Sequence, residues 1–238
     1  TLSSSSAASD VYKRQAVEGS VAVGKSTMMN YLKTMEELDG VVFLEEQIEK
    51  WRNWGGENIL EKFYSDKTRW GFLFQNLVFL TMIQRQIDSE KAEIRIMERS
   101  PASAKNVFVE YIEKENVIST AEAKVLLSWF DTLENKLNAN FKLDAIIYIA
   151  ADPECTHKRA TIRNRSEEKN LTAEYEKQLD MLHERWLFSN DKEKYENVYI
   201  IDGSKTKDEL IIEYHKAVQW LKELKTARDG YWMRAAQK

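Results

Sequence analysis

The feature that most constrains this chain is an eight-residue segment that fits the pattern Gly-x-x-x-x-Gly-Lys-Ser. It consists of Gly19, Ser20, Val21, Ala22, Val23, Gly24, Lys25 and Ser26, and a run of helical character begins at Thr27. In this pattern a glycine-bearing loop turns backbone N–H groups toward phosphate oxygens, while the lysine adds positive charge and the serine hydroxyl suits Mg²⁺. The alternative is a strand-to-helix turn that binds nothing. Because the chain has only 8 glycines, a chance match to a pattern that contains two of them is less expected. The segment therefore predicts a nucleoside triphosphate site over residues 19–27.

Composition limits the other classes of function. With 238 residues, 43% of them hydrophobic and 31% charged, the chain has material for one α/β domain, with two domains as the weaker alternative. No run approaches the roughly 20 apolar residues of a membrane span, and a formal charge of −4 argues against a broad nucleic-acid-binding face. Cys155 is the single cysteine, which excludes an internal disulfide and suits a reducing, cytoplasmic location.

Residues 1–15 are predicted to be an extension foreign to the domain. They are rich in serine, do not begin with methionine and end in a segment, 10–15, that resembles translated adapter DNA. A mitochondrial presequence is the alternative interpretation of this Ser-rich start. Because only residues 16–18 remain as a strand before the phosphate loop, part of 11–15 is expected to complete that strand. The domain itself is predicted to cover residues 16–226, followed by a tail at 227–238.

Short apolar runs and helical periods alternate along the chain. Runs with the length and β-branched content of buried parallel strands occupy 41–44, 94–97, 145–149 and 198–201. Helical periods occupy 77–87, 102–113, 121–137, 175–188 and 209–224. This alternation predicts an α/β fold with a five-stranded, mainly parallel sheet and helices on both faces.

Acidic residues follow several predicted strands, at the sheet edge where open α/β folds bind ligands. They are Glu45, Glu46, Glu98, Asp152 and Asp202. Asp152 precedes Pro153 and is more simply explained as a helix N-cap. Glu46 and Glu98 have no such structural explanation.

Two further groups of residues suit a nucleotide site. Arg159 and Arg163 share one helix face and Arg165 falls where that helix frays, so the three are predicted to form a lid over a triphosphate. A solvated basic helix is the alternative. Aromatic residues crowd the segment 51–79, which is explained by core packing or by a pocket for a planar base. Within it, Phe74 offers a stacking face and Gln75 an amide that both donates and accepts.

The order and spacing of these landmarks resemble the deoxyribonucleoside kinases over about residues 17–224. The matching segments are the phosphate loop, Glu46 with 49–53, Trp70 with Phe74 and Gln75, 98–100, and 159–168. The resemblance implies the P-loop kinase fold with an Arg-rich lid, transfer of the γ-phosphoryl group of ATP to the 5′-hydroxyl of a deoxynucleoside, a requirement for Mg²⁺, and a homodimer.

The resemblance also implies roles for individual residues. Glu46 matches the general base, Arg99 the partner that holds the acceptor oxygen and the transferring group, and Ser26 with Glu98 the magnesium site. Lys25, the lysine of the phosphate loop, is the third predicted catalytic residue. Tyr64 and Glu168 match the pair that grips the sugar 3′-hydroxyl. The remaining matched substrate residues are Trp51, Phe74, Gln75, Val78, Met82, Ala104 and Phe108. The uncharged residues 78, 82 and 104 favour a pyrimidine, with thymidine and deoxycytidine first.

The sequence departs from the family pattern in several places and leaves alternatives open. Ala22 replaces the middle glycine of the loop, and Glu45 places a second carboxylate beside Glu46. Alternation at a strand end is expected to point these two carboxylates to opposite sides. A nucleoside monophosphate kinase of the thymidylate type and a non-catalytic nucleotide-binding subunit are the competing interpretations. The apolar faces of 102–113 and 121–137, with Trp129 and Phe130, are expected either to pair across a two-fold axis or to complete the monomer core.

Overall fold

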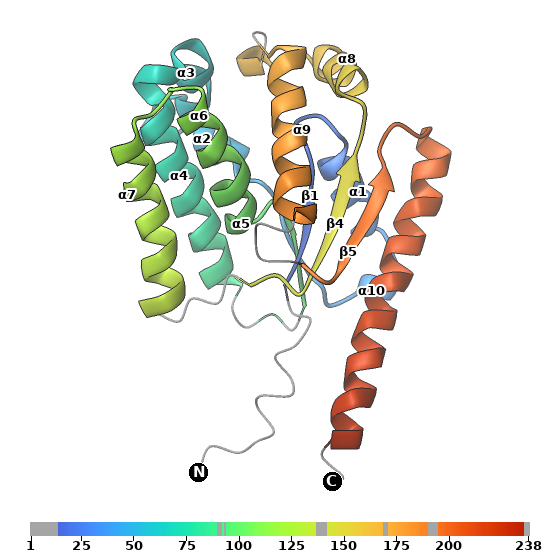
Figure 1. Ribbon diagram of the computed structural model, residues 1–238. Helices are drawn as coiled ribbons and strands as arrows, with labels where there is room; N and C mark the ends of the chain where they lie inside the picture. The colour runs from blue at the N-terminus through green and yellow to red at the C-terminus, as the bar shows by residue number, and fades with distance from the viewer. Residues whose placement is uncertain are drawn as a thin grey trace.

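The computed structural model describes residues 14–89, 92, 94–136, 142–168, 171–189 and 195–235. Its centre is a sheet of strands β1 Arg14–Glu18, β2 Val42–Leu44, β3 Arg95–Glu98, β4 Ala145–Ala150 and β5 Val198–Asp202, in the order β2-β3-β1-β4-β5. Every strand pair is parallel. All five carboxyl ends therefore meet at one edge, the upper edge in Figure 1. The predicted five-stranded parallel sheet is confirmed.

Strand β1 lies at the middle of the sheet and begins before the predicted domain boundary. Arg14 pairs with Arg95 of β3, and Gln15 pairs with both Ile96 of β3 and Ala145 of β4. The expectation that residues upstream of 16 complete this strand is confirmed for Arg14 and Gln15. The rest of the predicted extension, residues 1–13, lies outside the described residues.

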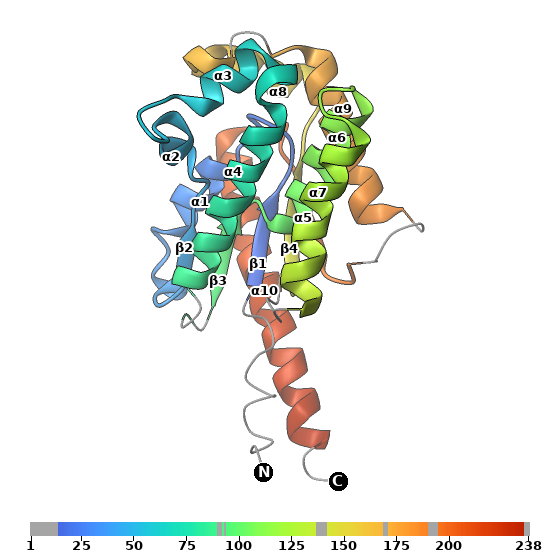
Figure 2. The ribbon, with the colours of Figure 1, turned by 90° about the vertical axis from the view of Figure 1, so that its left-hand side faces the viewer.

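Helices cover both faces of the sheet, and each face has its own hydrophobic core (Figures 1 and 2). Helices α1 Lys25–Leu32 and α10 Lys207–Ala235 cover one face, where they meet β4 through Ile147 and Ile149. Helices α4 Lys67–Asp88, α7 Thr120–Asp131 and α9 Ala173–Phe188 cover the other, where they meet Ile146 and Tyr148. Successive side chains of β4 thus pack into opposite cores. Because the strand is buried on both sides, its sequence is an unbroken apolar run.

Shorter helices complete the chain and place the site residues. They are η1 Glu36–Leu38, α2 Ile48–Arg52, α3 Ile59–Ser65, α5 Pro101–Ser103, the π-helical η2 Ala104–Val109, α6 Glu110–Lys114, the π-helical η3 Thr132–Lys136, α8 Pro153–Arg163 and η4 Ser166–Glu168. The predicted helix at 102–113 therefore contains a π-helical stretch, and the one at 121–137 continues past α7 into η3, with Leu137 outside the described residues. Helix α10 continues past the predicted boundary at 226 and extends beyond the sheet (Figure 1).

Caps fix the start of two helices that carry site residues. Asp152 Oδ1 accepts the N–H of Glu154 (2.7 Å) and Pro153 is the first residue of α8, which confirms the N-cap interpretation. Asp66 Oδ1 accepts the N–H of Arg69 (3.0 Å), so α4 begins at Lys67 rather than at Leu77. Within the described part of the chain, no helix has the combined length and apolarity needed to cross a bilayer.

Candidate active site

The phosphate loop connects the end of β1 to the start of α1. Gly19 has φ +140°, and a Cβ there would collide with the carbonyl oxygen of Ile149, so the loop requires glycine at this position. Gly24 has φ 114° and caps α1, accepting the N–H of Met28 (3.0 Å) at its carbonyl. Ala22 also has a positive φ, +57°. The loop therefore keeps its left-handed turn where the middle glycine is replaced.

Lys25 is buried beneath the loop that it follows. Its Nζ donates hydrogen bonds to the carbonyl oxygens of Ser20 (2.7 Å) and Gly19 (3.2 Å). Burial, and next the charge of Arg99, lower the pKa of Lys25 to about 7, while Glu98 and Glu46 oppose the shift. The ammonium is thus held by uncharged oxygens that phosphate oxygens would outcompete electrostatically.

Glu98, the last residue of β3, lies directly beside the first turn of α1. Ser26 Oγ donates a hydrogen bond to Glu98 Oε1 over 2.7 Å, and the glutamate is buried. A hydroxyl and a carboxylate are oxygen ligands of the kind that Mg²⁺ prefers, so the pair fits the predicted metal role. Among the described residues there is no cluster of three or more His, Cys, Asp or Glu side chains that suits a metal ion. A cation held here would need oxygens from phosphate and water to complete its shell.

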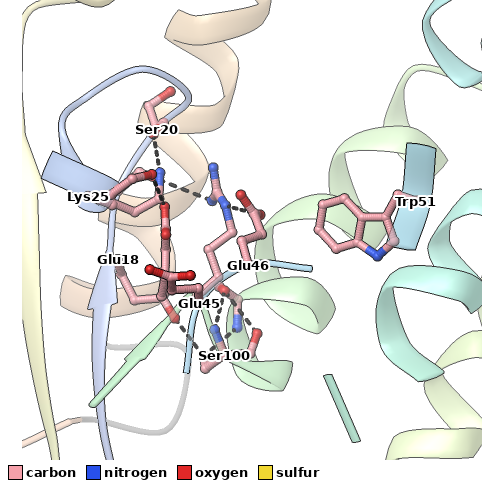
Figure 3. Close-up of polar contacts among 12 residues, drawn as sticks. Glu18, Ser20, Lys25, Glu45, Glu46, Trp51 and Ser100 are labelled. Carbon is pink, nitrogen blue, oxygen red and sulfur yellow. Dashed lines mark hydrogen bonds and ion pairs between the residues drawn. The ribbon is translucent and has the colours of Figure 1, made fainter. Parts of the chain in front are cut away.

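Arg99 joins β3 to the loop and to Glu46, which is labelled in Figure 3. Its Nε lies 2.9 Å from Glu46 Oε1, and its Nη1 donates to the carbonyl oxygen of Gly19 (3.2 Å). The guanidinium also lies over the ring of Phe108, 4.5 Å from the centroid. Arg99 has φ +59°, a left-handed conformation that is strained for a residue with a long side chain. Glu46 and the phosphate loop are therefore linked through one buried guanidinium.

Glu45 does not share this environment. Its carboxylate pairs with Lys33 and its side chain is 52% exposed, whereas that of Glu46 is 17% exposed. The expectation that the two carboxylates point to opposite sides of the strand end is confirmed.

One cavity of about 490 Å³ brings most of the predicted site residues together. Its lining includes Val21, Ala22, Val23, Gly24, Lys25, Ser26, Thr27, Glu46, Trp51, Tyr64, Phe74, Gln75, Val78, Met82, Glu98, Arg99, Phe108, Arg159, Arg163, Arg165 and Glu168. Gly19, Ser20 and Ala104 are buried and are not part of this lining. The phosphate loop and the aromatic segment are thus two parts of a single space.

The aromatic end of the cavity is built on α2, α3 and α4. Trp51 Nε1 donates to Thr81 Oγ1 (3.0 Å), and the Trp51 ring meets Phe74 edge-on at 5.6 Å. Phe74 in turn stacks on Phe63 at 4.7 Å. Gln75 is buried at this end, and its amide has no hydrogen bond to another described residue. A buried amide of this kind carries unused donor and acceptor capacity into the cavity.

Glu168 lies at the side of the cavity, between the arginines and Tyr64. It is buried and forms ion pairs with Arg163 and with Arg165 (3.2 Å from Nη1). Burial, and next the charge of Glu168, raise the pKa of Tyr64. Arg159 instead donates to the carbonyl oxygens of Gly203 (2.6 Å) and Val23 (3.4 Å). All three predicted lid arginines border the cavity, but two of them are engaged by a carboxylate.

Glu167 ties this region to α2. Arg52 donates to both of its carboxylate oxygens, over 2.6 and 3.2 Å, and this hydrogen bonding lowers the pKa of Glu167 to about 2. Bidentate pairing is the strong geometry for these two groups. Helix α2, which follows Glu46, is therefore fastened to the segment that carries Glu168.

The sequence analysis missed two groups of residues. Arg85, in the last turn of α4, is buried and donates to backbone carbonyls at the ends of β2 and β3. Its position two turns after Val78 and one turn after Met82, on the buried helix face, was the available signal. The cavity also extends to residues on α1 and at the start of α10, which are Tyr31, Lys205, Lys207, Leu210, Ile211 and Tyr214. No motif marks these residues, because only the fold brings α10 beside the loop.

Comparison with known proteins gives a consistent assignment. Residues 15–224 match the family model described as deoxynucleoside kinase. Human mitochondrial thymidine kinase 2 is 36% identical over 171 residues, which cover 72% of this chain and 63% of that protein. Human deoxycytidine kinase is 30% identical over 197 residues, which cover 74% of this chain and 75% of that protein. A probable deoxycytidine kinase of fowlpox virus is 31% identical over 189 residues, which cover 78% of this chain and 76% of that protein. The chain thus matches less than two thirds of the length of its thymidine kinase 2 relative. The phosphate loop, the site geometry and the family match together place this chain in the deoxynucleoside kinase family.

Proposed function

We propose that the protein transfers the γ-phosphoryl group of ATP to the 5′-hydroxyl of a deoxyribonucleoside. The observation that carries this proposal is the single cavity in which the phosphate loop with Lys25 meets the Glu46–Arg99 pair and the aromatic pocket around Gln75. Direct phosphoryl transfer needs a donor and an acceptor in one space from which water is excluded. The names of the thymidine and deoxycytidine kinase relatives agree with it.

The acceptor nucleoside is placed at the aromatic end. Gln75 would pair with an edge of the base, whose faces would lie against Phe108 and the Trp51 side of the pocket. Tyr64 and Glu168 would bind the 3′-hydroxyl, which directs the 5′-hydroxyl toward Glu46. Glu46 would accept the proton of that hydroxyl as the new P–O bond forms.

The donor is placed along the phosphate loop. Lys25 and the backbone N–H groups of the loop would bind the phosphates, with the nucleoside end of ATP toward Leu210 and Tyr214. Arg99, already paired with Glu46, would stabilise charge on the transferring group. Ser26 and Glu98 would hold Mg²⁺, which neutralises phosphate charge when bound. Arg159, Arg163 and Arg165 would close over the phosphates as a lid.

A pyrimidine base is favoured by the pocket's uncharged wall. Val78 and Met82 border the cavity without charge, and Ala104 is buried behind it. An apolar wall leaves room for a thymine methyl and offers no charged partner that would select cytosine alone. Thymidine and deoxycytidine are therefore the proposed substrates, in that order.

A homodimer is also proposed, with its interface on α7, which is part of the predicted 121–137, and on α4. Helix α4 takes the place of the predicted 102–113, in which no large hydrophobic residue is exposed. Helices α4 and α7 lie side by side on one flank of the molecule (Figure 2) and leave apolar side chains exposed. The exposed residues are Leu73, Leu80 and Ile87 on α4 and Val125 and Trp129 on α7. Phe130, by contrast, is buried against Phe79, with ring centroids 3.8 Å apart, and completes the monomer core. An apolar stripe over two adjacent helices suits a two-fold interface.

A coupled ATP-consumption assay tests the catalytic proposal. The four deoxynucleosides and dTMP would each be supplied with ATP and Mg²⁺, and the products identified by chromatography. We expect turnover with thymidine and deoxycytidine and none with dTMP. Turnover with dTMP alone would identify a monophosphate kinase, and ATP binding without turnover of any acceptor would identify a non-catalytic subunit. A marked preference for deoxyguanosine would refute the pyrimidine assignment.

A further inference from the structure

The hydrogen-bonded ladder between β2 and β3 stops just before the residues that face the cavity. The last register pair is Leu44 with Met97. Beyond it the two chains continue as Glu45 and Glu46 on one side and Glu98 and Arg99 on the other. Their carbonyl groups at this point have no ladder partners across the gap, so some other group must satisfy them.

The side chain of Arg85 fills this gap. It reaches from α4, is buried, and its Nη1 donates to the carbonyl oxygens of Leu44 (3.0 Å) and Glu45 (2.8 Å). Its Nη2 donates to the carbonyl oxygens of Glu98 (2.9 Å) and Arg99. One planar guanidinium thus bridges the two strand ends through four backbone oxygens, a geometry that a lysine ammonium cannot reproduce.

Burying the charged guanidinium of Arg85 costs desolvation free energy, which other interactions must offset. Burial lowers the pKa of Arg85 to about 10, and the charges of Glu46, Glu18 and Glu98 oppose the shift, so the guanidinium stays charged at neutral pH. Its desolvation is offset by the four carbonyl groups and by these three carboxylates. The same guanidinium that satisfies these carbonyls therefore also acts electrostatically on Glu46, whose charge has the largest effect of the three.

We infer that Arg85 is a positioning residue, which sets the distance between Glu46 and Arg99 by holding the carbonyl of Arg99 together with those of Glu98, Glu45 and Leu44. Its four hydrogen bonds go to backbone oxygens, and it would act through the residues that face the substrate. The inference rests on the proposed function, because it assigns Arg85 to the phosphoryl transfer that Glu46 and Arg99 perform.

Removing the guanidinium tests the inference. In Arg85→Ala we expect kcat to fall by about 10- to 100-fold, as is typical when a reacting group is misplaced by about 1 Å. Affinity for ADP should change by less than about threefold, because the phosphate loop does not contact Arg85. Guanidinium chloride at millimolar concentration should restore part of kcat, and sodium chloride at the same ionic strength should not.

Arg95 provides the matched control. It is a buried arginine at the opposite end of β3, where its Nη1 donates to the carbonyl oxygen of Gln86 (3.3 Å). Arg95→Ala should lower the melting temperature while leaving kcat near the wild-type value. If Arg85→Ala loses stability and keeps kcat in the same way, Arg85 is a structural brace and the inference is overturned.

A second variant keeps the test independent of folding and of turnover. Arg85→Lys retains the charge and most of the volume, and in its crystal structure the Glu46–Arg99 ion pair, 2.9 Å here, should be lost or lengthened. An unchanged ion pair in that structure overturns the inference even if wild-type protein shows no kinase activity. A wild-type protein without activity would instead refute the proposed function.

Discussion

Glu45 and Glu46 are consecutive in the chain, yet their carboxylates lie on opposite sides of the end of β2. Glu46 is paired with the buried Arg99 and lines the cavity, while Glu45 is paired with Lys33 at the surface. The two residues therefore provide a test in which charge, size and sequence position are matched and only the environment differs.

Glu46→Gln should lower kcat for thymidine by about 10²-fold or more, because the amide cannot accept the 5′-hydroxyl proton. Affinity for ATP should be retained. Glu45→Gln should leave kcat within about twofold, since a surface ion pair contributes little. The measurement is kcat of the two variants in steady-state kinetics. An equal loss of kcat in both would show that Glu46 is not the general base.

Binding of ATP should be accompanied by proton uptake. With a pKa of about 7 in the ligand-free protein, Lys25 is about half neutral at pH 7. Phosphate charge raises this pKa, so close to half a proton should be taken up on binding at pH 7 and less at pH 6. Calorimetry in two buffers of different ionisation enthalpy measures the number. Lys25→Arg is the control, because its guanidinium stays charged, and wild-type binding without uptake would contradict the prediction.

Ala22→Gly should stabilise the protein. Ala22 has φ +57°, a conformation that costs an alanine roughly 1–2 kcal/mol and a glycine almost nothing. Part of that gain is cancelled by the greater freedom of glycine in the unfolded chain, which leaves a net increase of about 0.5–1 kcal/mol in the free energy of unfolding. Ala123→Gly, within the regular helix α7, should instead destabilise by about 1 kcal/mol. Urea denaturation of the two variants should show opposite signs, and a loss in both would mean that the loop is not strained at Ala22.

Tyr64→Phe should weaken recognition of the sugar 3′-hydroxyl. Wild-type protein should prefer thymidine strongly over 3′-deoxythymidine, because the analogue leaves buried polar groups without partners. In Tyr64→Phe the ratio of the two kcat/KM values should fall by about tenfold. Tyr111 also borders the cavity and is buried, so Tyr111→Phe is the matched control and should keep the ratio. An unchanged ratio in Tyr64→Phe would place the 3′-hydroxyl elsewhere.

His183 should make stability depend on pH between about 3 and 6.5. The residue is fully buried, its Nδ1–H donates to the carbonyl oxygen of Leu179 (2.7 Å), and burial lowers its pKa to about 3 from 6.5. Below pH 6.5 the unfolded chain binds a proton that the folded chain does not, so the free energy of unfolding falls as pH decreases, by up to about 1.4 kcal/mol per unit. His183→Gln should remove this contribution to the slope, while His215→Gln at the exposed surface should not. Parallel slopes for all three proteins would mean that His183 is protonated in the fold.

The sequence predicted the elements that local rules determine. Buried strands produce uniformly apolar runs, so 145–149 and 198–201 were found within a residue or two of β4 and β5. The phosphate loop and the cap at Asp152 follow from short motifs whose physics is local. The start of α4 was missed because the aromatic run from Trp70 to Phe79 shows no clear helical period, and tertiary packing on both sides of the helix overrides that signal.

Contacts between distant segments account for the rest. The family resemblance supplied Glu46, Arg99 and Glu168, and the structure places all three around one cavity. The resemblance could not predict the ion pairs of Glu168 or the hydrogen bonds of Arg85. These contacts depend on how separate helices and strands pack together. The end of the cavity near Tyr214 was missed for the same reason, since α10 lies far from the phosphate loop in the sequence.

The cavity extends from Trp51 and Gln75, past Lys25, to Leu210 and Tyr214. Two nucleosides joined by an oligophosphate tether would therefore occupy both ends as one molecule. Such a compound would lose its translational and rotational freedom once instead of twice, which raises affinity without any new contact. We therefore expect a tethered dinucleoside to bind more tightly than either nucleoside alone, an expectation that rests on the proposed function.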